Sequence, residues 1–203
     1  MDKTDFCSAW NAADPSPPVI ADTRTHAHAA ATPHYAAADP GVIDIWYWRL
    51  SPPASTLENL RHNLYLEERA RAVRFAAKLH GDRFVAGRGY LREILGQYLH
   101  RPPRSLFIHC NAFGKPQLGN GLAGALHFNL SHSGDFAALA VSPAFDVGID
   151  IEERRPLEEN IAERFFSPRE AGTLRRMSGE RALQAFYRCW TSKEAFVKAH
   201  GAG

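Results

Sequence analysis

The spacing of apolar and polar residues along the chain predicts two groups of helices with a group of strands between them. The run Val42–Leu50 is β-branched and aromatic and is ended by Pro52 and Pro53, which is typical of a strand. Three helices are predicted next, the last with an apolar stripe at helical spacing. Their expected ranges are 57–62, 65–78 and 81–100.

Short apolar runs separated by turn residues follow, and they favour an antiparallel meander. The expected strands are 106–109, 127–131, 136–142 and 146–152. Helices resume, with expected ranges 158–165, 168–177 and 180–200. Because strands and helices come in blocks rather than in regular alternation, the pattern predicts an α+β fold.

The first part of the chain shows no periodicity. Residues 1–41 are rich in Ala, Pro, Asp and Thr, which predicts a disordered tail. His26, His28 and His34 resemble a small metal-binding tract, but this composition favours the tail. We therefore divide the chain into the tail, an N-terminal half over 42–145 and a C-terminal half over 146–203.

Composition excludes several classes of protein. With 203 residues, 45% hydrophobic and 23% charged, the chain is neither a disordered polymer nor a collagen-like fibre. No apolar run approaches the roughly 18 residues of a membrane helix, so no membrane partner is expected. Cys7, Cys110 and Cys189 lack disulfide or zinc spacing and predict reduced thiols in the cytoplasm.

Charge is unevenly distributed, although the net charge of +2 is too small to indicate nucleic-acid binding. Residues 61–104 hold ten Lys and Arg against four Asp and Glu, whereas residues 105–163 hold three against eight. A site that binds phosphates on one side and a cation on the other has this pattern, and so do two solvated faces. The candidate phosphate-binding residues of the basic helices are Arg74, Lys78, Arg83 and Arg88.

Two carboxylates share one face of the expected strand 146–152. Side chains alternate in a strand, so Asp150 and Glu152 lie on the same side as Gly148. The carboxylates repel each other unless a positive charge lies between them, and Gly148 leaves room for a ligand. A strand whose polar face meets water is the alternative.

A third carboxylate lies within the apolar stripe of the last helix. Glu194 falls inside an arc of about 100° that is formed by Leu183, Phe186, Tyr187, Trp190 and Val197. A charge there is costly unless it is paired or binds a metal. Pairing with Lys198, four residues on, explains a surface position but not this one. Together Asp150, Glu152 and Glu194 predict a site for a hard cation such as Mg²⁺.

The chain resembles the 4′-phosphopantetheinyl transferases of the surfactin-synthetase-activating type in five sequence blocks and in the order of these blocks. The blocks are 113–116, 128–133, 147–152, 164–170 and 190–198. The resemblance runs from about Trp46 to Gly203 and implies two similar α/β halves with antiparallel sheets in a pseudo-twofold arrangement. Family members continue past the last helix with further strands. We therefore expect a truncated protein whose second half lacks its C-terminal strands.

The resemblance implies an activity. The family transfers the phosphopantetheine arm of coenzyme A to a serine of an acyl, peptidyl or polyketide carrier protein and releases adenosine 3′,5′-bisphosphate. By this resemblance, Asp150, Glu152 and Glu194 bind Mg²⁺ together with the diphosphate. Glu194, or a water that it orients, helps to deprotonate the serine, and Lys198 stabilises charge on the transferred phosphate.

The resemblance also implies contacts with coenzyme A. Lys115 and Pro116 border the adenine, and Ser131 and His132 contact the phosphates. His132 and basic residues such as Lys78 lie near the 3′-phosphate, and the resemblance leaves open which role each of Arg74, Arg83 and Arg88 takes. Phe165 and Phe166 are either carrier-docking contacts or core residues.

Two other functions remain open from the sequence. One is a catalytically inactive, truncated module that binds coenzyme A or the carrier protein. The other is an RNA-binding domain on the basic helices, but the aromatic platform that it needs is not evident. The resulting expectation is a cytoplasmic monomeric transferase without nucleic-acid or membrane partners.

Overall fold

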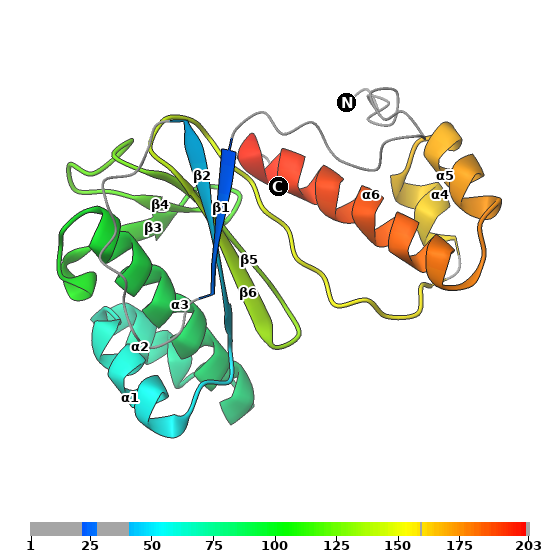
Figure 1. The fold of residues 1–203 in the computed structure, drawn as a ribbon. Coiled ribbons are helices and arrows are strands. Elements are labelled where there is room, and N and C mark those ends of the chain that lie inside the picture. The colour runs from blue at the N-terminus through cyan, green and yellow to red at the C-terminus, as the bar shows by residue number, and fades with distance from the viewer. Residues whose placement is uncertain (1–21, 28–40, 159, 202–203) are drawn as a thin grey trace.

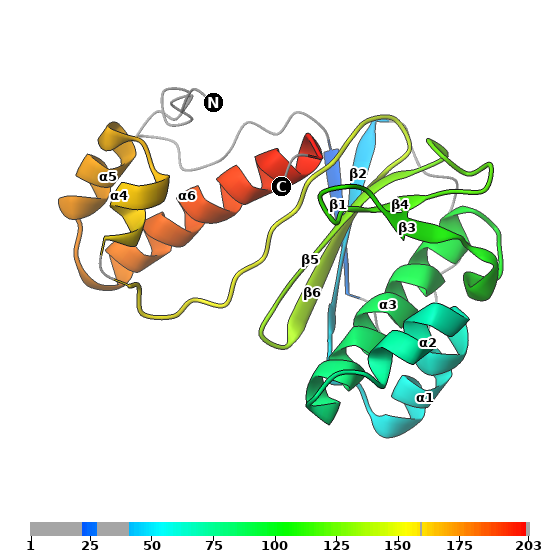
Figure 2. The ribbon, with the colours of Figure 1, turned by 180° about the vertical axis from the view of Figure 1, so that it is seen from behind.

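The structure is a computed structural model that describes residues 22–27, 41–158 and 160–201. Within these residues, helices α1–α3 cover one face of a four-stranded sheet, and helix α6 lies on the other side of that sheet (Figure 1). Figure 2 shows the same arrangement from behind. The predicted mixed fold with antiparallel sheets is confirmed, whereas the pseudo-twofold relation of two halves stays a prediction.

The larger sheet has the strand order β1-β2-β6-β5. Strands β2, β6 and β5 pair antiparallel, and β1 pairs parallel with β2. The bounds are β1 Asp22–Ala27, β2 Val42–Arg49, β5 His127–Ser133 and β6 Phe136–Ser142. A separate hairpin joins β3 Ile108–Cys110 to β4 Pro116–Leu118.

The core lies between this sheet and the first helices, whose bounds are α1 Ala54–Asn63, α2 Leu66–Ala72 and α3 Lys78–Tyr98. The predicted apolar stripe of α3 buries Leu91, Ile94 and Leu95 against Trp46 and Trp48 of β2. A short 3-10 turn, η2 Pro103–Ser105, follows α3. No helix among the described residues combines the length and hydropathy needed to cross a membrane.

Strand β1 corrects the prediction of a disordered tail, most of which lies outside the described residues. Its polar side chains provide partners for Asp44, which is only 3% exposed. Arg24 Nε donates to Asp44 Oδ1 at 2.9 Å, and His26 Nε2 lies 3.0 Å from the same oxygen. Tyr98 donates its hydroxyl to Asp44 Oδ2 at 2.7 Å. A buried carboxylate needs such partners, and this explains why a strand without an apolar pattern pairs here.

Three further helices form a second group, with bounds α4 Ile161–Phe165, α5 Pro168–Arg175 and α6 Gly179–Ala199. Phe166 is buried against Phe186 of α6, so it is a core residue, whereas Phe165 is 48% exposed. Buried Glu170 accepts a hydrogen bond from Lys193 Nζ at 2.6 Å. The group therefore packs on α6 from Phe186 to Lys193, and the last turns of α6 reach the sheet (Figure 1).

The segment between β6 and α4 differs from the prediction. The strand expected over 146–152 is wrong, because these residues are extended but have no strand pairing. In Figure 1 this segment is the yellow connection that runs from the sheet to α4. Its backbone N–H groups are bound by side chains instead, as described below.

Candidate functional site

Three polar side chains of β5 hold the segment Val147–Glu153 in place. The acceptors are two residues apart, and so are the backbone N–H groups that donate to them. The bonds are Ile149 N to Asn129 Oδ1 at 2.8 Å, Ile151 N to Ser131 Oγ at 3.4 Å and Glu153 N to Ser133 Oγ at 3.0 Å. We call these three side chains, with the N–H groups that they accept, the polar ladder.

Gly148 lies directly against the last turns of α6. A Cβ atom at this position would lie 1.9 Å from Ala195 O and 2.5 Å from Ala199 N. The sequence suggested that Gly148 leaves room for a ligand, and this is wrong. The absent side chain instead lets the backbone of α6 approach the segment.

Asp150, Ser131 and Lys198 meet at the point where the segment, β5 and α6 come together. Lys198 Nζ is ion-paired with Asp150 Oδ1 and lies 3.1 Å from Ser131 Oγ. The Ser131 hydroxyl donates to Asp150 Oδ1 at 2.9 Å. Among the described residues, the buried Asp150 Oδ2 has no hydrogen-bond partner. The carboxylate is therefore held by one oxygen and has the other available for a ligand.

Glu152 follows Asp150 by two residues on the segment, and Glu194 precedes Lys198 by one turn of α6. Glu152 Oε2 accepts the Ser133 hydroxyl at 2.8 Å. The segment runs along α6 in the opposite direction, since Asp150 contacts Lys198 and Arg155 N donates to Tyr187 Oη at 3.0 Å. Because the directions are opposite, Glu194 lies further along α6 toward the Glu152 end of the segment than Lys198 does.

The three predicted metal ligands do not converge fully. In the part of the chain that the structure describes, no group of three or more His, Cys, Asp or Glu side chains could hold a metal ion. The donors nevertheless fit Mg²⁺, which is commonly bound by one or two carboxylates and completed by water and phosphate oxygens. Asp150 Oδ2 is the buried oxygen that such an ion would satisfy, and Glu152 lies on the same side of the segment.

Lys115 connects the hairpin loop to the end of α6. Its ammonium group donates to the carbonyl oxygens of Lys198 at 2.8 Å, Val147 at 3.2 Å and Ala199 at 3.4 Å. Burial lowers the pKa of Lys115, and the charge of Asp146 partly opposes this effect. Positive charge at the carbonyl end of a helix is favourable, so Lys115 stabilises the last turn of α6.

Two family profiles match most of this chain. The profile of a family described as 4′-phosphopantetheinyl transferase, N-terminal, matches residues 48–144, and that of the 4′-phosphopantetheinyl transferase superfamily matches residues 146–203. The 4′-phosphopantetheinyl transferase HetI of Nostoc sp. is 44% identical over 79% of this chain and 69% of its own length. This chain belongs to the 4′-phosphopantetheinyl transferase superfamily. The 4′-phosphopantetheinyl transferase psf-1 of Bacillus pumilus is 38% identical over 72% of this chain and 62% of its own length, so the chain spans about two thirds of these relatives.

Two other predicted residues, His132 and Pro116, are neighbours in sequence of residues described above. His132 is exposed on β5, next to Ser131, and Pro116 begins β4, next to Lys115. The phosphate contact of His132 and the adenine contacts of Lys115 and Pro116 stay predictions.

The basic residues expected to bind coenzyme A lie in the turn before α3 and along α3. Lys78 is exposed and pairs with Asp82, and Arg74 is exposed in the turn before α3. Arg83 Nη2 lies 3.8 Å from Asp135 Oδ1, in the β5–β6 turn that follows the polar ladder. Arg88 lies 3.8 Å from Cys110 Sγ and from Glu68 Oε1. Only Arg83 among these four thus has a contact beside the ladder in the described residues.

The predicted site residues do not include Asn129 and Ser133, which the structure brings to this candidate site. Asn129 and Ser133 alternate with Ser131 on one face of β5, while Phe128 of the opposite face packs in the core. The signal was present, because polar residues at every second position of a buried strand need partners. Their partners lie some 20 residues away and could not be identified from spacing.

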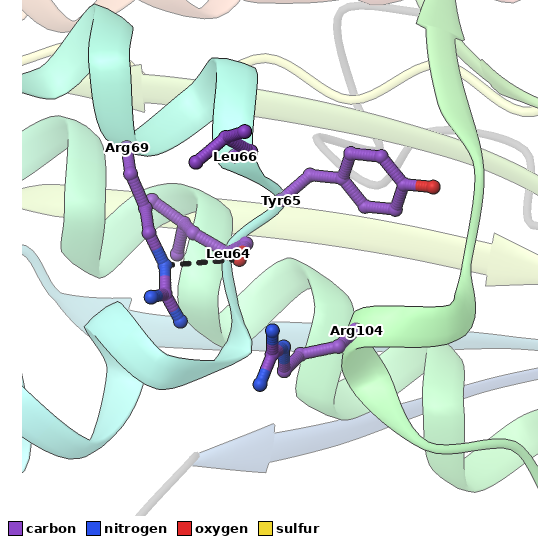
Figure 3. Close-up of a pocket in the computed structure, with 5 residues that line it drawn as sticks. All are labelled: Leu64, Tyr65, Leu66, Arg69 and Arg104. Atoms are coloured by element: carbon purple, nitrogen blue, oxygen red, sulfur yellow. Dashed lines mark hydrogen bonds between the residues drawn. The ribbon is translucent and has the colours of Figure 1, made fainter.

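The pocket in Figure 3 lies apart from these residues. It has a volume of about 310 Å³, lies between the beginning of α2 and η2, and is lined by Leu64, Tyr65, Leu66, Arg69 and Arg104. Arg69 Nε donates to Leu64 O at 3.2 Å across its wall. None of the predicted transferase residues lines it, so the candidate site rests on the contacts around Asp150.

Proposed function

We propose that the protein transfers the 4′-phosphopantetheine moiety of coenzyme A to a serine of an acyl, peptidyl or polyketide carrier protein, with Mg²⁺, and releases adenosine 3′,5′-bisphosphate. The observation that carries the proposal is the contact of Ser131, Asp150 and Lys198, which brings together residues from the ranges matched by both family profiles. The two profiles meet between residues 144 and 146, which supports our division into halves at 145 and 146.

Charge at the site supports a divalent cation bound together with a diphosphate. Asp150, Glu152 and Glu194 carry three negative charges when ionised, and Lys198 carries one positive charge. A bound Mg²⁺ would balance the resulting charge of −2 and would reduce the repulsion between these carboxylates and the diphosphate of coenzyme A. Asp150 and Glu152 are the residues that would hold it, and the buried Asp150 Oδ2, which has no hydrogen-bond partner among the described residues, would be one ligand oxygen.

The remaining residues act on the reacting groups. Lys198 provides a positive charge for the transferred phosphate, at a place where Asp150 and Ser131 fix its ammonium group. Glu194, one turn before Lys198 and half-buried, is the candidate to accept the proton of the carrier serine, directly or through a water. Phosphoryl transfer depends mainly on such positioning and electrostatic stabilisation.

Contacts with coenzyme A are the last part of the proposal. Because the Ser131 hydroxyl is engaged by Asp150 and Lys198, we assign to Ser131 the placing of these two residues in addition to the predicted phosphate contact. His132, exposed next to Ser131 on β5, and Arg83, beside the β5–β6 turn, are the candidate donors for the phosphates of coenzyme A. The protein is proposed to act as a monomer in the cytoplasm.

The test is incubation of the protein with coenzyme A, Mg²⁺ and an apo carrier protein, followed by the intact mass of the carrier. We expect a gain of one phosphopantetheine group, and Asp150→Asn and Glu194→Gln should abolish it. Gln184→Ala, on an exposed part of α6, is the control that should label normally. A folded protein that binds coenzyme A but labels no carrier would favour the inactive binding module instead.

A further inference from the structure

We propose that Asn129 and Ser133 are positioning residues that set the register of the segment bearing Asp150 and Glu152. The inference rests on the proposed function in taking these two carboxylates as the metal ligands. Neither Asn129 nor Ser133 touches the reacting groups in our proposal. Both act through the polar ladder.

The ladder contains a repeated unit. The Ser131 hydroxyl donates to Asp150 Oδ1 at 2.9 Å and accepts the N–H of Ile151 at 3.4 Å. The Ser133 hydroxyl likewise donates to Glu152 Oε2 at 2.8 Å and accepts the N–H of Glu153 at 3.0 Å. Each hydroxyl therefore fixes one carboxylate and the backbone of the next residue together.

The rung at Asn129 differs in a way that the packing explains. Asn129 is 3% exposed and accepts the N–H of Ile149 at 2.8 Å, but the residue before Ile149 is Gly148. No side chain fits at Gly148, because Ala195 of α6 occupies that space. This rung can therefore only fix the backbone, and it does so at the end of the ladder nearest to α6.

Register matters because the segment alternates between carboxylates and β-branched residues. A slip by one residue would bring Ile149 and Ile151 to the places of Asp150 and Glu152. The segment lies on the face of β5 opposite the buried Phe128, where the segment has no strand pairing to fix its register. Side-chain acceptors at every second position of β5 perform that task in its place.

The experiment compares Ser133→Ala and Asn129→Leu with Ser133→Thr, which keeps the hydroxyl. Ser142→Ala is the matched control: the Ser142 hydroxyl also accepts a backbone N–H, from Ala144 at 3.2 Å, but outside the ladder. Amide hydrogen exchange reports each rung, and calorimetric titration of Mg²⁺ with coenzyme A and without carrier reports metal affinity without turnover. The transferase assay then separates the KM for Mg²⁺ from kcat.

In Ser133→Ala we expect faster exchange at Glu153 but not across β5, together with Mg²⁺ binding weakened about 10-fold, the usual scale for residues that orient metal ligands. Asn129→Leu should show the same at Ile149, and Ser133→Thr should restore Mg²⁺ binding. Unchanged exchange, or losses in Ser133→Ala no different from those in Ser142→Ala, would overturn the inference. If the variants show the local exchange changes but the wild-type protein labels no carrier, the result would support the ladder and refute the transferase proposal.

Discussion

Replacing Gly148 by alanine should displace α6 and separate the residues of the site. The new Cβ would lie 1.9 Å from Ala195 O, about 1.5 Å short of an ordinary contact of 3.4 Å. The obstacle is helix backbone, which cannot rotate away as a side chain can. Gly148 does not have a positive φ, so the whole cost is steric. Such overpacking costs about 1–3 kcal/mol of the free energy of unfolding.

The same displacement should also lower the rate of transfer. Either α6 or the segment must move by more than 1 Å, which separates Lys198 from Asp150, and a misplacement of about 1 Å can lower a rate roughly 100-fold. We would measure carrier labelling by intact mass and unfolding by urea titration. Gly172→Ala is the control, because a Cβ there meets no atom within 4 Å and should stabilise α5 by about 0.5–1 kcal/mol. Wild-type labelling and stability in Gly148→Ala would refute the close packing of α6 on the segment.

Two further predictions concern buried charges. Arg92 is 1% exposed and donates hydrogen bonds to Glu68 and to the carbonyl oxygens of Pro103 and Leu106. Arg92→Leu should therefore lower the free energy of unfolding, measured by urea titration, by about 3–5 kcal/mol. A loss below about 1 kcal/mol would contradict this pairing. Burial alone raises the pKa of Glu170, but hydrogen bonds from Lys193 and Ser167 outweigh it and lower the pKa below 4.5. Ionised Glu170 therefore contributes its full stabilisation above about pH 4.5, and this contribution is lost as the pH falls through the lowered pKa. Glu170→Gln should have a smaller free energy of unfolding than wild type at pH 7 and approach the wild-type value in acid. A difference that is the same at every pH would contradict this cause.

The elements with strong periodicity were predictable from the sequence. The β-branched run of β2 and the apolar stripe of α3 lie where the pattern placed them. Strand β1 was not predictable, because its polar residues pair with Asp44, about 20 residues away. An alternation of apolar residues is the sign of a strand that contributes to a core, and β1 contributes partners for a buried charge instead.

The contact of Asp150 with Lys198 joins two residues that the sequence singled out, but the sequence did not predict the contact itself. Helical geometry placed Glu194 and Lys198 on one face, and alternation placed Asp150 beside Glu152. The role of Gly148 was misread, because its neighbour Ala195 lies far along the chain and only the folded structure brings the two together. Lys115 was expected at the adenine, and its contacts with the end of α6 depend on the same long-range packing.

The hydrogen bond from Lys115 Nζ to Lys198 O joins positions 83 residues apart. Because the candidate site depends on such long-range contacts of α6, its stability differs from the stability of the fold. In the part of the chain that the structure describes, the main core between the sheet and α1–α3 contains no residue of α6. Release of the last turns of α6 would therefore take Lys198 away from Asp150 while that core remains intact. Local opening of this kind requires less free energy than global unfolding. On heating, the ability to transfer should consequently be lost before the sheet melts, so inactivation temperature and melting temperature are two distinct properties of this protein.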